Sequence, residues 1–301
     1  MPFQFKTIGL VGTHTSPLVA ETLSDAVQTL EVWGLKCLIE KESAKAMHNL
    51  SYNIASMDEV AEKSDLILAV GGDGNLLQAA RIASLYGVPV VGINRGQLGY
   101  LTDLSPEDFK VHLRKILEGE FIEEQRFLLT GKVIGIDGKK KKELKNNALN
   151  DIVLFPGEIA QLIEFELRID GQFVYSQRSD GLIISTPTGS TAYALSAGGP
   201  IIAPSLNVLL LVPKLPHTLS NRPVVINADS IIEISLSPNN KTAARLSYDG
   251  QNHVTLELGD IIQIERQEKL LKLLHPAHYD YYEIWREKLG WGKQLIKVGA
   301  R

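Results

Sequence analysis

The chain has 301 residues, of which 44% are hydrophobic and 22% are charged, and this composition excludes a disordered, collagen-like or coiled-coil protein. Its 31 basic and 35 acidic side chains leave a formal net charge of -4, so there is no electrostatic reason to expect a nucleic acid or a membrane as partner. The single cysteine, Cys37, cannot form an internal disulfide, and neither a signal-peptide pattern nor a bilayer-length apolar run is present, so we expect a cytoplasmic protein.

Short apolar runs alternate with longer mixed segments up to about residue 125, which is typical of strands separated by helices. The apolar runs predict strands at residues 7–11, 35–39, 65–70 and 87–94. Residues 17–34 have the spacing of a helix with one apolar face. Because continuous apolar runs suit strands that are buried on both faces, we expect an α/β domain with a parallel sheet over residues 1–125.

The period of the hydrophobic pattern changes to two from about residue 127. Apolar and charged residues alternate from Ile163 to Ile169, and Asp170-Gly171 follows as the turn of a predicted hairpin. A second Asp-Gly pair at residues 137 and 138 predicts another turn. Further strands are expected at residues 232–236, 245–248, 254–258 and 261–264. We therefore expect a β-rich, antiparallel, sandwich-like domain over residues 126–275.

Helical spacing returns after Pro276. Tyr281, Trp285 and Leu289 share one helix face, and Gly290 follows as a predicted C-terminal cap. An isolated helix of this length is marginal in water. We therefore expect the segment 276–301 to pack back on the first domain.

The strongest single motif is Gly71-Gly72-Asp73-Gly74, which lies between a predicted strand and a predicted helix. Glycines permit positive φ and remove the Cβ atoms that would keep backbone amides away from a bulky anion, and a helix N-terminus favours phosphate. A carboxylate beside phosphates is repelled unless it holds a metal or accepts a proton, so Asp73 is a candidate magnesium contact or general base. The residues leave open a tight strand-to-helix turn in which Asp73 is the helix N-cap.

A second informative stretch extends from Arg178 to Pro200. An apolar strand at residues 181–184 leads into a dense cluster of hydroxyl-bearing and small residues, a composition that lets a polar ligand approach the backbone closely. Tyr193, within this cluster, is placed to cover a base. Such clusters are often plain loops, but the length of this one and the flanking Asp180 favour a binding site.

Asn150-Asp151 directly precedes a predicted strand. An amide and a carboxylate at a strand edge can hold a ribose diol or an exocyclic amine, and an Asx turn is the alternative explanation. The sequence has no Gly-x-x-x-x-Gly-Lys-Ser/Thr loop, no Gly-x-Gly-x-x-Gly fingerprint, no His-Glu-x-x-His and no Gly-x-Ser-x-Gly. The three stretches therefore match none of these general nucleotide, zinc or serine-nucleophile motifs.

Taken together and in order, the three stretches resemble the motifs of the NAD kinase family of bacterial type. The family has a Gly-Gly-Asp-Gly loop, an Asn-Glu pair, and an Asp-Gly strand that leads into Thr-Pro-Thr-Gly-Ser-Thr-Ala-Tyr, which this chain has from Asp180 to Tyr193. The segment from Gly92 to Asp103 is also similar to the family. Diacylglycerol and sphingosine kinases and 6-phosphofructokinases share the Gly-Gly-Asp-Gly loop alone, so the long third motif distinguishes the resemblance.

The resemblance implies transfer of the γ-phosphoryl group of ATP to the 2′-hydroxyl of the adenosine ribose of NAD, which gives NADP, with Mg²⁺ or another divalent cation on the phosphates. It implies that Asp73 accepts the hydroxyl proton and that Gly71, Gly72 and Gly74 cradle phosphate. It assigns no metal ligand on the chain. The residues that it implies for NAD binding are Asn150, Asp151, Gln161, Arg178, Asp180, Thr188, Thr191, Ala192, Tyr193, Ser196 and Gln251.

The chain departs from the family pattern at two of these positions. Asp151 replaces the usual Glu and is one methylene shorter, and Gln161 stands where similar bacterial members carry His. Arg178 matches the Arg of members that prefer oxidised NAD, whereas members that also accept NADH have Gly, so we expect a preference for NAD. The resemblance also implies a homodimer or homotetramer in which the NAD site lies near a subunit contact.

Two other functions remain as alternatives. A lipid kinase would share the glycine-aspartate loop, but the sequence has no amphipathic or basic membrane anchor. A dinucleotide-binding regulator without catalysis would bind NAD and turn over no ATP, and the presence of Asp73 speaks against it.

Overall fold

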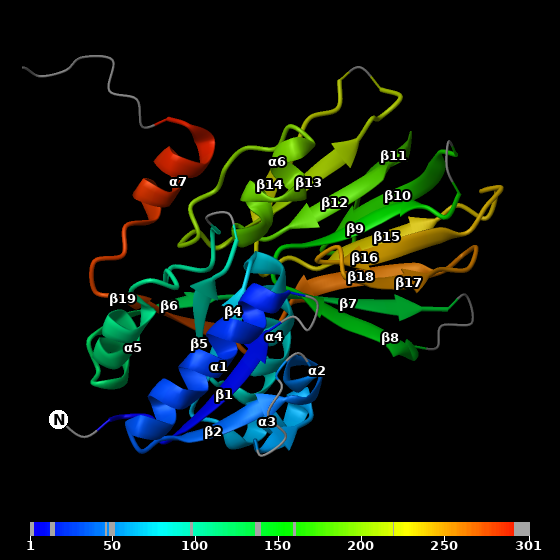
Figure 1. Cartoon of the computed structure of the whole chain (residues 1–301). Coiled ribbons are helices and arrows are strands. Elements are labelled where there is room, and N and C mark those ends of the chain that lie inside the picture. The colour runs from blue at the N-terminus through cyan, green and yellow to red at the C-terminus, as the bar shows by residue number, and fades with distance from the viewer. Residues whose placement is uncertain are drawn as a thin grey trace, which may run out of the picture. The chain divides into compact units, whose positions relative to one another are not determined.

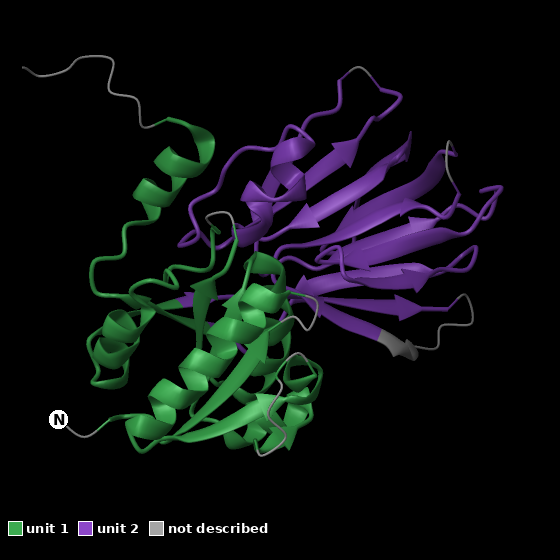
Figure 2. Ribbon diagram, viewed as in Figure 1, with its two compact units in different colours: residues 1–124, 272–301 green, residues 125–271 purple. Residues whose placement is uncertain are grey.

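The fold is described from a computed structural model of the chain (Figure 1). It describes residues 3–12, 16–45, 47, 52–96, 99–135, 140–158, 161–218 and 220–291. The chain divides into two compact units, one formed by residues 1–124 with 272–301 and the other by residues 125–271 (Figure 2). No helix of the described part of the chain has the length and apolarity needed to cross a bilayer.

Unit 1 contains a seven-stranded sheet with the order β3-β2-β1-β4-β5-β19-β6. The pairs from β3 to β19 are parallel, as the continuous apolar runs predict. The α/β class predicted for this part of the chain is therefore confirmed. The strands are β1 (Thr7–Gly12), β2 (Lys36–Glu40), β3 (Ile54–Ala55), β4 (Leu66–Gly71), β5 (Val90–Asn94), β6 (Phe121–Arg126) and β19 (Leu271–Pro276).

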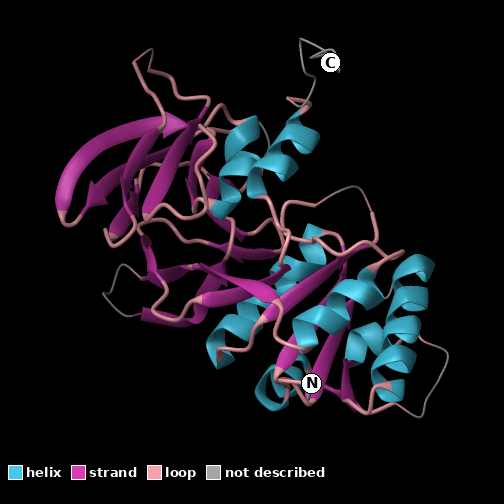
Figure 3. Cartoon of the chain, turned by 90° about the vertical axis from the view of Figure 1, so that its left-hand side faces the viewer, coloured by secondary structure: helices cyan, strands magenta, loops and turns pink. Residues whose placement is uncertain are grey.

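Helices cover both faces of this sheet (Figure 3). Leu10 of β1 shares one core cluster with Leu23 of α1 and Leu113 of α5. On the opposite face, a Cβ added to Gly9 would lie 2.6 Å from the Val60 side chain of α3, so the missing side chain lets this helix pack closely. The helices of unit 1 are α1 (Pro17–Val32), α2 (Lys41–Ala44), α3 (Met57–Lys63), α4 (Asp73–Tyr86), α5 (Phe109–Leu117) and α7 (Tyr281–Leu289).

The strand order creates a switch point between β1 and β4. From β1 the chain runs through α1 to β2 on one side, and from β4 it runs through α4 to β5 on the other side. In open α/β sheets, ligands bind outside the carboxyl ends of the strands at such a point, where the two connections separate. The Gly71–Gly74 loop directly follows β4, so the fold places it at this edge of the sheet.

Unit 2 consists of two six-stranded antiparallel sheets with the orders β11-β10-β15-β18-β7-β8 and β14-β13-β12-β9-β16-β17. Phe165 of β10 belongs to the same buried cluster as Leu154 of β9 and Leu246 of β16, so the sheets share one core. The predicted sandwich-like class is confirmed. The strands are β7 (Leu129–Ile134), β8 (Lys140–Ala148), β9 (Asp151–Pro156), β10 (Ile163–Ile169), β11 (Gln172–Ser179), β12 (Gly181–Ser185), β13 (Val208–Lys214), β14 (Val224–Asn227), β15 (Ile232–Leu236), β16 (Ala244–Tyr248), β17 (Asn252–Thr255) and β18 (Ile261–Arg266).

The predicted hairpin is formed by β10 and β11. Asp170 and Gly171 adopt φ values of 52° and 76°, which suit the tight turn between the two strands. The strand predicted at 254–258 ends earlier, because the Asp260 carboxylate accepts the Glu257 N–H at 3.0 Å and the chain turns there. The turn predicted at 137–138 lies outside the described residues.

The last described helix, α7, begins at an Asp280 N-cap whose side chain accepts the Tyr282 N–H. It ends at Gly290, which adopts a φ of 67°, and this confirms the predicted cap. None of its residues is fully buried. The Nζ atom of Lys288 lies 5.3 Å from the centre of the Tyr100 ring, a contact within unit 1.

Buried and exposed side chains alternate along the hairpin, so the loss of an aromatic ring should affect stability strongly at a buried position and little at an exposed one. Phe165 is fully buried, whereas Phe173 is 55% exposed on the paired strand. We expect Phe165→Ala to lower the free energy of unfolding by about 3–5 kcal/mol, since it leaves a cavity in the shared core. The matched Phe173→Ala should change it by less than about 0.5 kcal/mol. Urea unfolding followed by circular dichroism measures both, and equal losses would contradict the alternation.

Candidate active site

The Gly71–Gly74 loop forms the junction between β4 and α4. Gly71 adopts a φ of 137°, and a Cβ there would lie 2.0 Å from Nδ2 of Asn75, which donates to the Val70 carbonyl at 2.9 Å. Gly72 is the N-cap of α4 and Asp73 is the first residue of the helix. The alternative in which Asp73 is the N-cap is therefore wrong. The Asp73 carboxylate instead bonds to another segment of the chain.

The Asp73 carboxylate is held by the segment that follows β5. Its Oδ2 accepts the Tyr100 N–H at 2.8 Å, and its Oδ1 accepts the Leu101 N–H at 3.1 Å. A Cβ added to Gly99 would lie 2.2 Å from Oδ1, so only glycine allows the backbone to come this close. Neutral amide donors thus orient a half-buried carboxylate beside the glycine-rich loop. The sequence reasoning noted the 92–103 motif and missed this contact.

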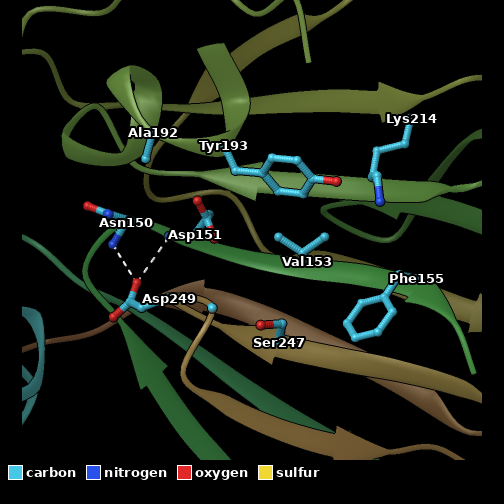
Figure 4. Close-up of a pocket in the computed structure, with 10 residues that line it drawn as sticks. Asn150, Asp151, Val153, Phe155, Ala192, Tyr193, Lys214, Ser247 and Asp249 are labelled. Carbon is cyan, nitrogen blue, oxygen red and sulfur yellow. Dashed lines mark hydrogen bonds between the residues drawn. The ribbon is translucent and has the colours of Figure 1, made fainter. Parts of the chain in front are cut away.

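A cavity of about 380 Å³ lies in unit 2 (Figure 4). Residues from four separate segments of the chain meet in it, because β9 lies between β12 and β16 in one sheet. Four of its residues are among those proposed from the sequence: Asn150, Asp151, Ala192 and Tyr193. The remaining residues that line it are Val153, Phe155, Lys214, Ser247, Asp249 and Gly250.

Asp249 is the lining residue that organises the polar end of this cavity, and the sequence reasoning missed it. Asp249 and Gly250 have φ values of 52° and 66°, and the Gln251 N–H donates to the Tyr248 carbonyl at 3.0 Å, which closes a tight turn between β16 and β17. The Asp249 carboxylate accepts backbone N–H groups of the segment at the start of β9, namely those of Leu149 (3.0 Å), Asn150 (2.7 Å) and Asp151 (3.3 Å). The Asp-Gly pair was visible in the sequence, but its partner segment was not.

Asp151 is buried beside this carboxylate. Burial, and secondarily the charge of Asp249, raises the pKa of Asp151 to about 7. Near neutral pH the protonated and ionised forms are therefore both populated. The carboxyl group can donate a hydrogen bond in one form and accept two in the other, which suits a ribose hydroxyl or an exocyclic amine.

The opposite wall of the cavity is aromatic and apolar. Tyr193 lies at the start of the short helix α6 (Tyr193–Ser196), and the Nζ atom of Lys214 is 5.1 Å from the centre of its ring. Val153 and Phe155 of β9 also line the cavity (Figure 4). A planar base fits a space with aromatic sides and a few polar groups at one end.

A second cavity of about 360 Å³ shares Phe155 and Lys214 with the first. Gln161 and Asp180 line it, together with Arg245 and residues 156–158. The two adjoining spaces therefore hold six of the residues proposed from the sequence.

The other proposed residues of unit 2 lie outside these two cavities. Thr188 is buried, and its hydroxyl accepts a hydrogen bond from Nη1 of Arg126 at 2.9 Å. Thr191 donates to the Thr188 carbonyl at 3.3 Å within a 3₁₀ turn (Thr188–Thr191). Three further side chains are exposed and line neither cavity: Arg178, Ser196 and Gln251.

No cluster of three or more histidine, cysteine, aspartate or glutamate side chains with metal-binding geometry occurs among the residues that the structure describes. A carboxylate beside a glycine-rich helix N-terminus, and a nucleoside-sized cavity with aromatic and acidic walls, are the features of a nucleotide-dependent phosphotransferase.

Comparison with known proteins identifies the family. Residues 15–121 match the model of the ATP-NAD kinase N-terminal domain, and residues 149–275 match that of the ATP-NAD kinase C-terminal domain. The chain is 47% identical to a NAD kinase of Chromohalobacter salexigens, over 97% of this chain and 98% of that protein. It is 46% identical to a NAD kinase of Aeromonas salmonicida, over 98% of this chain and 100% of that protein. The chain therefore belongs to the ATP-NAD kinase family, as its motifs predict.

Two solved structures have similar folds. An NAD kinase from Archaeoglobus fulgidus in complex with ATP superposes with a TM-score of 0.71, at 27% identity over 94% of this chain and 97% of that chain. Yeast NADH kinase in complex with NADH superposes with a TM-score of 0.87 over 98% of this chain and 90% of that chain. Its identity of 22% supports the fold alone.

The environment of Asp151 predicts a pH dependence of stability. Its folded-state pKa of about 7 exceeds the ordinary value of 3.8, so the folded chain keeps a proton that the unfolded chain releases. The free energy of unfolding is therefore highest below about pH 4 and falls by up to about 4 kcal/mol as the pH rises to about 7.

Asp151→Asn should remove this loss, because its amide does not ionise. Urea unfolding at several pH values, with the exposed Asp58→Asn as control, measures the difference between the slopes. If the free energy of unfolding changed with pH equally in the wild type and in Asp151→Asn, this would contradict the raised pKa of Asp151.

Proposed function

We propose that this chain is a NAD kinase that transfers the γ-phosphoryl group of ATP to the 2′-hydroxyl of the adenosine ribose of NAD. The observation that carries the proposal is the half-buried Asp73 carboxylate, oriented by two backbone amides beside a glycine-rich helix N-terminus. The names of the relatives and the ATP in the Archaeoglobus fulgidus structure support the choice of substrates. Formation of NADP from ATP and NAD by the purified chain tests it.

Asp73 acts as the general base in this proposal. Its Oδ2 accepts the Tyr100 N–H and has a second lone-pair position for a substrate hydroxyl. As the 2′-oxygen forms its bond to the γ-phosphorus, the bond to the β-phosphate oxygen breaks, ADP leaves, and the hydroxyl proton passes to the carboxylate. The chain contributes position and charge balance, which is most of what phosphoryl transfer requires.

The proposed phosphate contacts come from the glycine-rich loop. Gly71, Gly72 and Gly74 present no Cβ, so phosphate oxygens can approach the backbone at the start of α4 directly. Gly72 and Gly74 are exposed, and nothing lies within 4 Å of a Cβ built at Gly72.

The cavities of unit 2 support the proposed binding of NAD. Tyr193 and Phe155 flank a base, while Asn150 and Asp151 bond ribose or base polar groups at the other end. Asp151 does so with a shorter reach than the usual Glu. Further contacts are proposed for the remaining residues of the set: Gln161, Arg178, Asp180, Thr188, Thr191, Ala192, Ser196 and Gln251.

Magnesium is the divalent cation that we propose for the reaction. Mg²⁺ in kinase sites is commonly held by substrate phosphates, waters and one or two carboxylates rather than by an all-protein cage. The residues present fit that mode, since the chain places the Asp73 carboxylate beside the glycine-rich loop. When bound, the ion neutralises developing charge on the phosphates.

The proposed setting is the cytoplasm, with a homodimer or homotetramer as the working assembly. Burial, and secondarily the charge of Glu31, raises the pKa of the single Cys37 thiol to about 12, so the thiol stays protonated at physiological pH. The composition offers no structural disulfide that would need an oxidising compartment.

Removal of the Asp73 charge should separate catalysis from binding. We expect Asp73→Asn to lower kcat by about 100-fold or more, as for loss of a general base, while the affinity for NAD stays nearly unchanged. An NADP-formation assay and calorimetric titration with NAD measure the two effects, and Asp58→Asn is the control for a lost surface carboxylate. An unchanged kcat would assign Asp73 to a structural role.

Arg178 should influence the choice between NAD and NADH. It is exposed on β11, so its replacement leaves the core of unit 2 intact. We expect Arg178→Gly to raise kcat/KM for NADH relative to NAD, whereas Arg168→Gly on the neighbouring strand should leave the ratio unchanged. Parallel assays with both dinucleotides measure this ratio. If the ratio does not move, another residue selects the redox state.

A further inference from the structure

A histidine between two carboxylates is buried in unit 1, away from any role assigned above. His275 lies on β19 with 1% of its surface exposed. Its Nδ1 is hydrogen-bonded to Oδ2 of Asp103, and its Nε2 lies 3.1 Å from Oε2 of Glu124 on β6. The ring of Tyr279 stacks on the imidazole with the ring centres 3.9 Å apart.

This arrangement defines the charge of the ring. Ionised carboxylates only accept hydrogen bonds, so bonds at both nitrogens require an N–H on each, as in the imidazolium. Burial opposes the charge, but the hydrogen bonds that the ring donates to Asp103 and Glu124, with the charges of these carboxylates, outweigh it and raise the pKa of His275. A buried cation thus links the segment after β5 to strand β6.

The Asp103 end of this link adjoins the segment that holds Asp73. Tyr100 and Leu101 donate their N–H groups to the Asp73 carboxylate, and Asp103 follows two residues later. Leu104 then enters backbone hydrogen bonds with β5, donating to the Gly92 carbonyl at 3.1 Å and accepting the Asn94 N–H at 2.8 Å. The hydrogen bond between His275 and Asp103 therefore fixes the 99–104 segment at a point between its backbone contact with β5 and its contact with the Asp73 carboxylate.

We propose that His275 is a positioning residue for phosphoryl transfer, which holds Asp103 and thereby keeps the amides of Tyr100 and Leu101 on the Asp73 carboxylate. The inference rests on the proposed role of Asp73 as the base. Catalytic groups act efficiently only when neighbouring groups fix their geometry, and a displacement of about 1 Å can cost about 100-fold in rate. The second carboxylate, Glu124, lies at the other nitrogen of the ring and orients the imidazole.

The two nitrogens can be separated by substitution. An Asn side chain at residue 275 places an amide donor near the position of Nδ1, which faces Asp103, and Gln places one near Nε2, which faces Glu124. We expect His275→Asn to keep kcat within about 3-fold of the wild type and His275→Gln to lower it by about 10- to 100-fold. Asp103→Ala removes the acceptor that faces Nδ1 and should resemble His275→Gln, while the matched Glu124→Ala removes the acceptor that faces Nε2 and should resemble His275→Asn.

The decisive experiment measures kcat and KM for NAD and ATP in these four variants, together with amide hydrogen exchange of the full chain. The proposal predicts lower kcat, KM values within about 2-fold, and faster exchange confined to residues 99–104 in His275→Gln and Asp103→Ala. Exchange in the β10–β11 hairpin should be unchanged. Unchanged kcat and exchange would overturn the proposal. So would raised KM values with faster exchange throughout unit 1, which is the result of general destabilisation.

The wild-type assay keeps this failure distinct from failure of the proposed function. A wild type that forms no NADP overturns the kinase proposal, and a wild type that forms NADP beside fully active His275→Gln and Asp103→Ala variants overturns only the positioning role.

Discussion

The hydrogen bonds from two backbone amides to the Asp73 carboxylate are the interaction on which this account depends. A carboxylate beside a phosphate-binding loop needs a defined orientation, and here the N–H groups of Tyr100 and Leu101 supply it without a second charge. The close approach exists because Gly99 lacks a Cβ. The absence of a side chain at Gly99, after β5, thus allows the backbone to bond the carboxylate of Asp73, after β4.

In unit 2, a carboxylate likewise accepts hydrogen bonds from backbone amides, at the start of β9. The Asp249 carboxylate accepts the N–H groups of residues 149–151, and this fixes Asn150 and Asp151 at the polar end of the larger cavity. Burial, and secondarily the charge of Asp249, raises the pKa of Asp151, so this end of the cavity can both donate and accept hydrogen bonds. Backbone amides held by aspartates therefore shape both candidate ligand-binding regions.

The sequence was sufficient for the fold class and for the approximate positions of the main elements, because burial on both faces of β1, β4 and β5 and on one face of β10 leaves distinct periodicities. It also located the loop around Asp73. It did not locate Asp249 or the Tyr100 amide as partners, because those contacts depend on register. The pairing of Tyr248 with Ile152 brings the β16–β17 turn beside Asn150, and no local pattern encodes that pairing. The same holds for His275, which meets Asp103 and Glu124 from a distant strand.

The most direct test of the central claim is a crystal structure of the chain with NAD and a non-hydrolysable ATP analogue. The account predicts that Oδ2 of Asp73 lies within hydrogen-bond distance, about 2.6–3.2 Å, of the 2′-oxygen of the adenosine ribose, with the amides of Tyr100 and Leu101 still bonded to the carboxylate. A 2′-oxygen that faces another side chain, with Asp73 bonded only to its own backbone partners, would contradict it.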